Sequence, residues 1–328
     1  MSAPTLAVSL IIGLGLSAIA GPWVLRHAAP ALMRLPRLAI ALLTGSILAW
    51  VLALLALGPM LAWVISGPAV LPGGAAEVCQ QCLTAANPFT SSPSIETVVP
   101  VVVLLALPTV GAAFHAISII LETQRRRRRT LRTARRLHAH SEPRSLHGYS
   151  VLVADDPHPF ALTLPERHGG IVISTGAIDL LAPDELAAVL AHEHAHLRQH
   201  HHLLTDILAS LTRRLRWIPL IAAAEDALGH YLEIAADDTA RRHVGTPALA
   251  SALLTLGRAG HPHHHDGAAL DGALHALGPD RIRHLVQPGT GMAGVISTTV
   301  SAGCLTALTF LAASVHVAYA IAALTGCN

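Results

Sequence analysis

Four apolar stretches set the first limit on what this chain can fold into. A helix needs roughly 20 residues to cross the hydrocarbon core of a bilayer. Stretches of that order cover about residues 4–25, 38–65, 98–121 and 293–324. Charged residues make up only 13% of the 328 residues, whereas a soluble domain usually carries about 25%. We therefore predict an integral membrane protein with four helical spans.

The arginines predict how the spans are oriented. The short loop at 26–37 carries arginines and no acid, and Arg125–Arg129 with Arg132, Arg135 and Arg136 follow the third stretch. Basic residues favour the cytoplasmic side, so we expect the N-terminus outside and residues 67–97 to form an external loop. The arginine run also predicts contact with anionic membrane lipids. Direct nucleic-acid binding is not expected, because no recognition helix accompanies the run.

Residues 183–202 predict a helix with the chemistry of a metal site. Pro183 suits the first helical position, and two acids follow it in the first turn, where the helix dipole favours negative charge. The helix contains the H-E-x-x-H pattern, which puts His192 and His196 a turn apart on one face. That spacing can seat both imidazoles on one zinc ion. Glu193 then stands where a general base for hydrolysis is needed.

A third ligand is expected from a later helix, predicted over residues 231–243. Glu233 and Asp237 lie four residues apart there and project from one face. A zinc site with two histidines and one glutamate needs such a distant carboxylate. We predict Glu233 as the third ligand and Asp237 as the acceptor that orients a ligand imidazole through its other nitrogen. The competing interpretation is a solvated acidic patch. One zinc ion per chain is the expected cofactor.

A small sheet is predicted ahead of the zinc helix. Three short β-rich segments separated by turn residues cover 150–154, 160–164 and 170–175. In zinc peptidases an edge strand beside the metal commonly holds the substrate chain by β-addition. We predict that Phe160, Ala161 and Leu162 bind substrate in this way.

The segment after the zinc pattern is predicted to stay helical. His200, His201 and His202 are expected to continue the same helix past the metal-binding pair, and a mostly apolar helix is expected over residues 203–220. That helix would lie on the inner membrane surface or pack under the metal site. As a specific metal site of their own, these three histidines are disfavoured.

Two features leave alternatives open. A group that stabilises the oxyanion of the tetrahedral intermediate is expected, and its candidates are His230, Tyr231 and His243. The cysteines expected on the external side are Cys79, Cys82 and Cys327. Oxidation is favoured there over metal binding, but the sequence does not choose which two of the three pair.

The run from Ile171 to His196, together with Glu233-x-x-x-Asp237, resembles the catalytic core shared by two groups of membrane zinc peptidases. One is the BlaR/MecR antirepressor family, and the other is the HtpX and CAAX-prenyl-protease (Ste24) family. The resemblance covers residues 145–245, about a third of the chain. It implies that the two histidines and the later glutamate hold zinc and that the glutamate of H-E-x-x-H is the base.

The order of the spans resembles the BlaR/MecR layout, with three spans before the zinc domain and one after it. HtpX-like proteins usually have two spans ahead of the domain and begin inside. Unlike the antibiotic-sensing BlaR/MecR members, the sequence carries no penicillin-binding domain after its last stretch, which argues against β-lactam sensing. The resemblance implies cleavage of a cytoplasmic protein, typically a winged-helix repressor, in response to an external signal.

We therefore predict a multi-pass α-helical membrane protein with four spans and a cytoplasmic α+β zincin-like metallopeptidase domain in the plasma membrane. The expected segments are spans 1 and 2 with a short cytoplasmic loop (1–66), an external loop (67–97), span 3 (98–124), the zinc domain (125–292), and span 4 with an external tail (293–328). The predicted function is zinc-dependent endopeptidase activity in regulated proteolysis. The alternatives are an HtpX-like quality-control protease and a non-catalytic membrane scaffold with a vestigial zinc site.

Overall fold

The structure, a computed structural model, describes residues 3–66, 101–259 and 294–325. Several predictions fall outside these ranges. They are the external loop at 67–97 with Cys79 and Cys82, the last part of the predicted zinc domain, and Cys327.

Three long apolar helices form a bundle. They are α1 (Ala3–Leu32), α2 (Pro36–Ser66) and α12 (Val295–Thr325). By length and composition, each contains a stretch able to cross a membrane, over Pro4–Leu32, Pro36–Gly58 and Val295–Val317. Their outward faces carry large apolar side chains, such as Ile19 and Ile296, which are 79% and 82% exposed. Such faces suit lipid rather than water, and the three helices correspond to the first, second and fourth predicted spans.

Two details of the bundle differ from the prediction. The segment 26–37 is mostly helical rather than a loop, because α1 continues to Leu32 and α2 begins at Pro36, a good first helical position. The second helix also continues to Ser66 through Gly58-Pro59, although a glycine followed by a proline is typical of a kink or an end. Glycine and proline are tolerated inside membrane helices because neighbouring groups satisfy the backbone that they disturb.

The predicted third span falls on the first part of α4 (Val101–His138). Residues 98–100 lie outside the described ranges, so four spans stay a prediction. The helix does not stop where its apolar part ends at Leu121. It continues without interruption through the arginine run and leads directly into the sheet.

The sheet has four strands in the order β1-β2-β4-β3. Its strands are β1 (Ser141–Leu146), β2 (Tyr149–Ala154), β3 (Ala161–Thr163) and β4 (Ile171–Ser174). The pair β2 and β4 is parallel, whereas β1 with β2 and β3 with β4 are antiparallel. The three predicted strands are therefore present, and β3 lies at an edge. The first strand was not predicted because its residues are mostly exposed and polar.

Helices pack on this sheet, and a hydrophobic core lies between the strands and these helices. They are α5 (Thr175–Leu180), α6 (Pro183–Arg198) and α9 (Thr246–Ala259). Apolar side chains of β2 and β4 pack with those of α6 and α9 in one buried cluster. Glu185 fixes the start of α6, because its carboxylate accepts a hydrogen bond from the backbone N–H of Ala182 and others from Ser251 and Thr255. The helix begins at Pro183 as predicted.

The histidines after the zinc pattern do not continue its helix. Helix α6, which carries the zinc pattern, ends at Arg198, and His200 adopts a left-handed backbone conformation with φ of 52°. A separate helix, α7 (His201–Thr212), starts at once in a new direction. It is also shorter than the predicted helix over 203–220, because residues 213–218 turn the chain and Pro219 opens the next helix.

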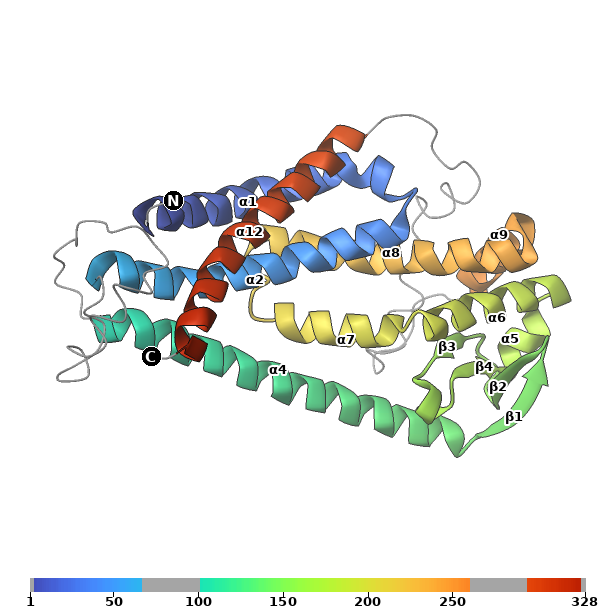
Figure 1. Ribbon diagram of the computed structural model, residues 1–328. Coiled ribbons are helices and arrows are strands. Elements are labelled where there is room, and N and C mark those ends of the chain that lie inside the picture. Colours follow the sequence, from blue (N-terminus) through green and yellow to red (C-terminus); the bar gives the residue numbers. More distant parts are fainter. Residues whose placement is uncertain (1–2, 67–100, 260–293, 326–328) are drawn as a thin grey trace.

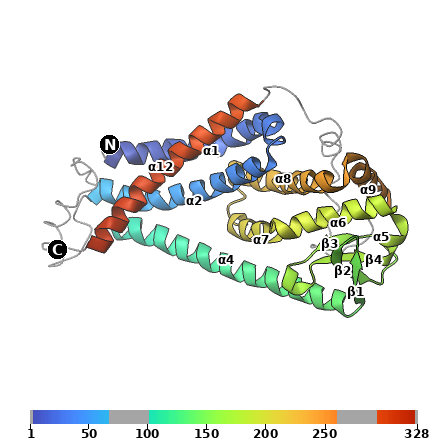
Figure 2. The ribbon, with the colours of Figure 1, turned by 45° about the vertical axis from the view of Figure 1, so that its right-hand side comes forward.

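The long helix α8 (Pro219–Val244) joins the helices around the sheet to the bundle. Its buried side chains, including Ala224, Leu228 and Tyr231, pack with Leu32 of α1 and Leu43 of α2. At its start the approach is close, since a Cβ atom at Gly21 would lie 2.5 Å from the Leu220 side chain. Figures 1 and 2 show α8 running from between the bundle helices to the sheet end of the molecule, so the helix that carries Glu233 is anchored on the bundle.

Candidate metal centre

The helix α6 presents His192 and His196 on one face, a turn apart, as their spacing predicts. Their Nε2 atoms lie 3.0 Å apart, and the ring centroids are separated by 4.7 Å. His192 is buried and His196 is half-buried. Both imidazoles therefore offer the same nitrogen to one point beneath the helix.

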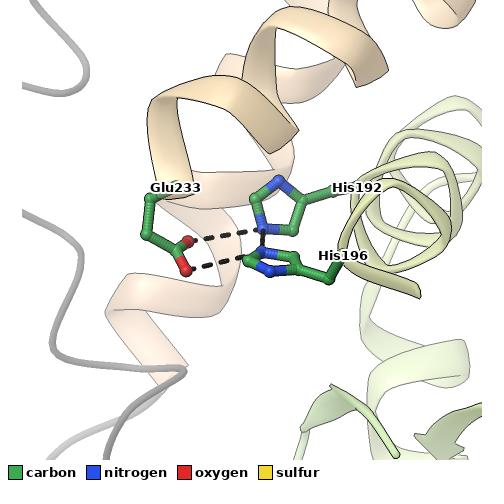
Figure 3. Close-up of side chains that lie close together, drawn as sticks. All are labelled: His192, His196 and Glu233. Atoms are coloured by element: carbon green, nitrogen blue, oxygen red, sulfur yellow. Dashed lines mark hydrogen bonds and ion pairs between the residues drawn. The ribbon is translucent and has the colours of Figure 1, made fainter. Parts of the chain in front are cut away.

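Glu233 comes to the same point from α8, which packs directly against α6. One carboxylate oxygen lies 3.4 Å from Nε2 of His192, and the other lies 3.4 Å from Nε2 of His196 (Figure 3). The structure thus brings together the three residues predicted as ligands, although they come from two helices and Glu233 lies 37 residues beyond His196. Within the described ranges, these are the residues that form a group of three able to hold a metal ion.

The donor set and its spacing fit zinc. Zinc binds imidazole nitrogen and carboxylate oxygen at about 2.0–2.1 Å, and in a tetrahedral site such bonds put neighbouring ligand atoms about 3.3 Å apart. The three separations here are 3.0, 3.4 and 3.4 Å. An ion could therefore bind without a large movement of either helix.

The charges around the cluster favour a cation. Asp237, also on α8, is 1% exposed, and its Oδ1 atom lies 2.9 Å from Nδ1 of His192. Burial alone would lower the pKa of His192, but the hydrogen bonds and charges of Asp237 and Glu233 outweigh it and raise that pKa to about 10. Burial acts to raise the pKa of Glu233, yet its hydrogen bonds with the two imidazoles hold that pKa well below the ordinary value. A buried site that stabilises positive charge so strongly suits a metal ion.

His201 contacts the second predicted ligand from the other side, which the sequence interpretation missed. Its Nδ1 atom lies 3.0 Å from Nδ1 of His196, and the two rings meet edge to face with centroids 4.8 Å apart. The side chain is 4% exposed, and burial followed by the charge of His196 lowers its pKa to about 3. Each imidazole of the cluster therefore has a partner at its second nitrogen, which is Asp237 for His192 and a neutral imidazole for His196.

The predicted base, Glu193, is 9% exposed and contacts the sheet. The Thr163 hydroxyl lies 2.7 Å from its Oε2 atom and 2.8 Å from its backbone carbonyl oxygen. This contact joins the end of β3 to the helix that carries the two histidines. Thr163 was not among the predicted site residues, since its position relative to Glu193 depends on how the sheet docks against α6.

The edge strand β3 lies beside α6, but its residues differ in whether their backbone groups are available to pair with a substrate strand. Phe160 lies just before the strand, and its carbonyl oxygen already accepts a hydrogen bond from Ser174 of β4. Leu162 is registered with Val172, so its backbone groups also point toward β4. Because alternate residues of a strand point to opposite sides, Ala161 and Thr163 direct their backbone groups to the free edge. Of the three predicted substrate-binding residues, only Ala161 is suited to β-addition.

The three oxyanion candidates lie in different surroundings. Tyr231 packs in the apolar cluster with α1 and α2, and burial raises its pKa to about 12. His243 is exposed, and its ring contacts the carbonyl oxygen of Thr239 one turn earlier. His230 is half-buried and precedes Glu233 by three residues, which puts it on the same side of α8. His230 therefore suits the role best on position.

Comparison with known proteins supports a peptidase. Residues 121–256 match the profile of peptidase family M48. A 79-residue segment is 25% identical to the protease HtpX homolog of Thermodesulfovibrio yellowstonii, covering 24% of this chain and 28% of that protein's length. No solved structure matches the chain. These matches support the M48 and HtpX-like part of the resemblance, which is a group of metalloproteases, whereas they do not confirm the BlaR/MecR part.

Proposed function

We propose that this protein is an integral membrane zinc endopeptidase that acts on protein substrates at the cytoplasmic face. The observation that carries the proposal is the convergence of His192, His196 and Glu233 on one point, with spacings that fit tetrahedral zinc. A match of the surrounding residues 121–256 to a peptidase family supports it independently.

When bound, zinc would polarise the substrate carbonyl and increase the acidity of a water molecule. Glu193 accepts the proton of the attacking water and passes it to the leaving amine nitrogen. Its carboxylate is kept in place by the Thr163 hydroxyl at 2.7 Å. Since Thr163 belongs to β3, the contact also couples the base to the strand that we propose holds the substrate.

Asp237 and His201 orient the two ligand imidazoles. A histidine that binds metal through Nε2 must carry its proton on Nδ1, so the group facing Nδ1 must accept a hydrogen bond. Asp237 accepts from His192 as a carboxylate, and His201 accepts from His196 as a neutral imidazole. The outer partners therefore select the tautomer that zinc requires.

Substrate binds as an added strand along β3. The backbone groups of Ala161 and Thr163 are directed to the free edge, where an extended peptide forms main-chain hydrogen bonds. Main-chain recognition of this kind requires an unfolded or extended substrate segment.

Two substrate classes remain candidates. The four-span layout favours regulated cleavage of a cytoplasmic repressor, with the domain kept inside by the arginines around it. The similarity to an HtpX homolog favours quality control of membrane proteins, and the packing of α8 on α1 and α2 suits a site close to the bilayer. The layout predicts an N-terminus outside, so a reporter fused there and found in the cytoplasm would favour quality control.

The test of hydrolysis is cleavage of an unfolded protein, such as reduced casein, by the full chain purified in detergent. We expect Glu193→Gln to lower the rate by about 10²–10⁴-fold while zinc binding is retained. The matched control is Glu142→Gln, because Glu142 is an exposed carboxylate of β1. If Glu193→Gln cleaved as fast as the unaltered protein, Glu193 would not be the base. If the unaltered protein cleaved nothing, the site would be a vestigial one in a membrane scaffold.

A further inference from the structure

One face of α4 carries six exposed arginines. At 100° per residue, Arg125, Arg128, Arg129, Arg132, Arg135 and Arg136 fall within an arc of about 120°. We call these six residues the arginine face. No carboxylate of the described residues pairs with them. Arg126 points inward instead, where it pairs with Glu122 at 3.3 Å and approaches Asp206 at 3.9 Å. The inner side of α4 is thus neutralised by acids, whereas the arginine face is not.

The same face of α4 is apolar toward the start of the helix. Val110, Phe114, Ile117 and Leu121 are large apolar residues that are all exposed. Their spacing of three and four residues puts them on one side, and that side is continuous with the arginine face. Within α4 itself, the change from apolar to basic side chains occurs within the single turn between Leu121 and Arg125. From outside the helix, the Arg214 guanidinium lies 4.5 Å from the centroid of the Phe114 ring.

The arginine face also lies at the level of the bundle's end. In Figures 1 and 2 the later half of α4 runs past the end where α1 and α2 are joined, and that junction carries Arg34. The basic part of α4 therefore lies near the end of the bundle at which α1 and α2 are joined.

We propose that the arginine face binds the phosphate groups of anionic lipids in the inner leaflet. A bilayer offers hydrocarbon and phosphate side by side, in the order in which α4 presents its apolar and basic residues. Nucleic acid or an acidic protein would complement the arginines but would not account for the apolar residues on the same face.

The length of the arginine face predicts a graded contribution. The eleven helical steps from Arg125 to Arg136 extend about 16 Å, whereas each headgroup layer is only about 6 Å thick. Arg125, Arg128 and Arg129 therefore contact phosphates directly. Arg132, Arg135 and Arg136 act across a longer distance, where salt screens the attraction.

The test measures lipid selectivity with the full chain reconstituted in phosphatidylcholine. Spin-labelled phosphatidylglycerol and phosphatidylcholine are compared, and the ratio of their association constants is the readout. We expect the ratio to favour phosphatidylglycerol. It should fall about fivefold or more when Arg125, Arg128 and Arg129, the three arginines nearest the apolar part of α4 (the near three), are changed to glutamine. Changing Arg132, Arg135 and Arg136 to glutamine should lower the ratio less, and a high salt concentration should abolish this smaller effect. The matched control is Arg167, Arg242 and Arg258 changed to glutamine, since these exposed arginines belong to elements other than α4 and their replacement removes the same charge.

Further measurements distinguish binding of lipid phosphate from binding of free phosphate or nucleic acid. Changing the near three arginines to lysine should retain the ratio, because the attraction depends on charge and the fold is not disturbed. Free phosphate should leave the selectivity unchanged. The proposal is overturned if the near three and the control variants lower the ratio equally, if free phosphate abolishes it, or if single-stranded DNA binds the arginine face in the presence of phosphatidylglycerol membranes. Cleavage of casein is measured on the same samples, so a loss of lipid selectivity is separable from a failure of the proposed hydrolysis.

Discussion

Removal of the Asp237 carboxylate tests how the ligands are held. Its Oδ1 atom lies 2.9 Å from Nδ1 of His192, and both groups are buried, so Asp237→Ala leaves a buried ring nitrogen without its acceptor. Loss of such an outer partner costs about 10–100-fold in metal affinity. That corresponds to about 1.4–2.7 kcal/mol, the range expected for a hydrogen bond to a charged group. We expect Asp237→Ala to weaken zinc binding by this factor and Asp237→Asn by less.

The assay is competition for zinc with a chromophoric chelator, using protein purified in detergent. The matched control is Asp238→Ala, because Asp238 is the next residue and pairs with Arg241 at 3.0 Å rather than with a ligand. Circular dichroism of both variants checks that the helices are retained. Equal zinc affinities for the Asp237→Ala variant and the unaltered protein would refute the assignment of Asp237 as the partner of a ligand.

Three further predictions follow from the site and its supports. Substitution of His201 by alanine should weaken zinc binding about 10-fold or more and alter the visible spectrum of the cobalt-loaded protein, while His202→Ala should do neither. Ala161→Pro removes a backbone donor at the free edge of β3, so it should raise KM more than it lowers kcat, and an unchanged KM would contradict β-addition. Hydrogen bonds from Ser251, from the backbone of residue 182 and from Thr255 lower the pKa of Glu185 from 4.5, against the effect of burial. The stabilisation by Glu185 is therefore present above about pH 4.5 and lost as the pH falls through the lowered pKa, so melting temperatures should fall less on acidification in Glu185→Gln.

Local sequence signals were sufficient for the parts of the site that lie within one helix. Pro183 and the acids after it predicted where α6 begins, and the spacing of His192 and His196 predicted that they share a face. Glu233 and Asp237 were identified in the same way, because four residues correspond to one turn of α8. The strands β2, β3 and β4 were also predicted, because each is a short run of residues with strand propensity between turn residues.

Contacts between elements could not be predicted in this way. His201 reaches His196 only because His200 adopts a left-handed conformation, and no glycine marks that position. Residues five apart on a straight helix do not face each other, so a continuous helix would have kept these rings apart. The contact of Thr163 with Glu193 depends on how the sheet docks on α6, which alternation along a strand does not reveal.

The most direct test of the account is the zinc content of the full chain purified in detergent, measured beside the Glu233→Ala and His196→Ala variants. The convergence of the three side chains predicts one zinc ion per chain in the unaltered protein and a large loss in both variants, with each variant still folded. A full complement of zinc in the Glu233→Ala variant would contradict the proposed site, because the ion would then be bound by other residues.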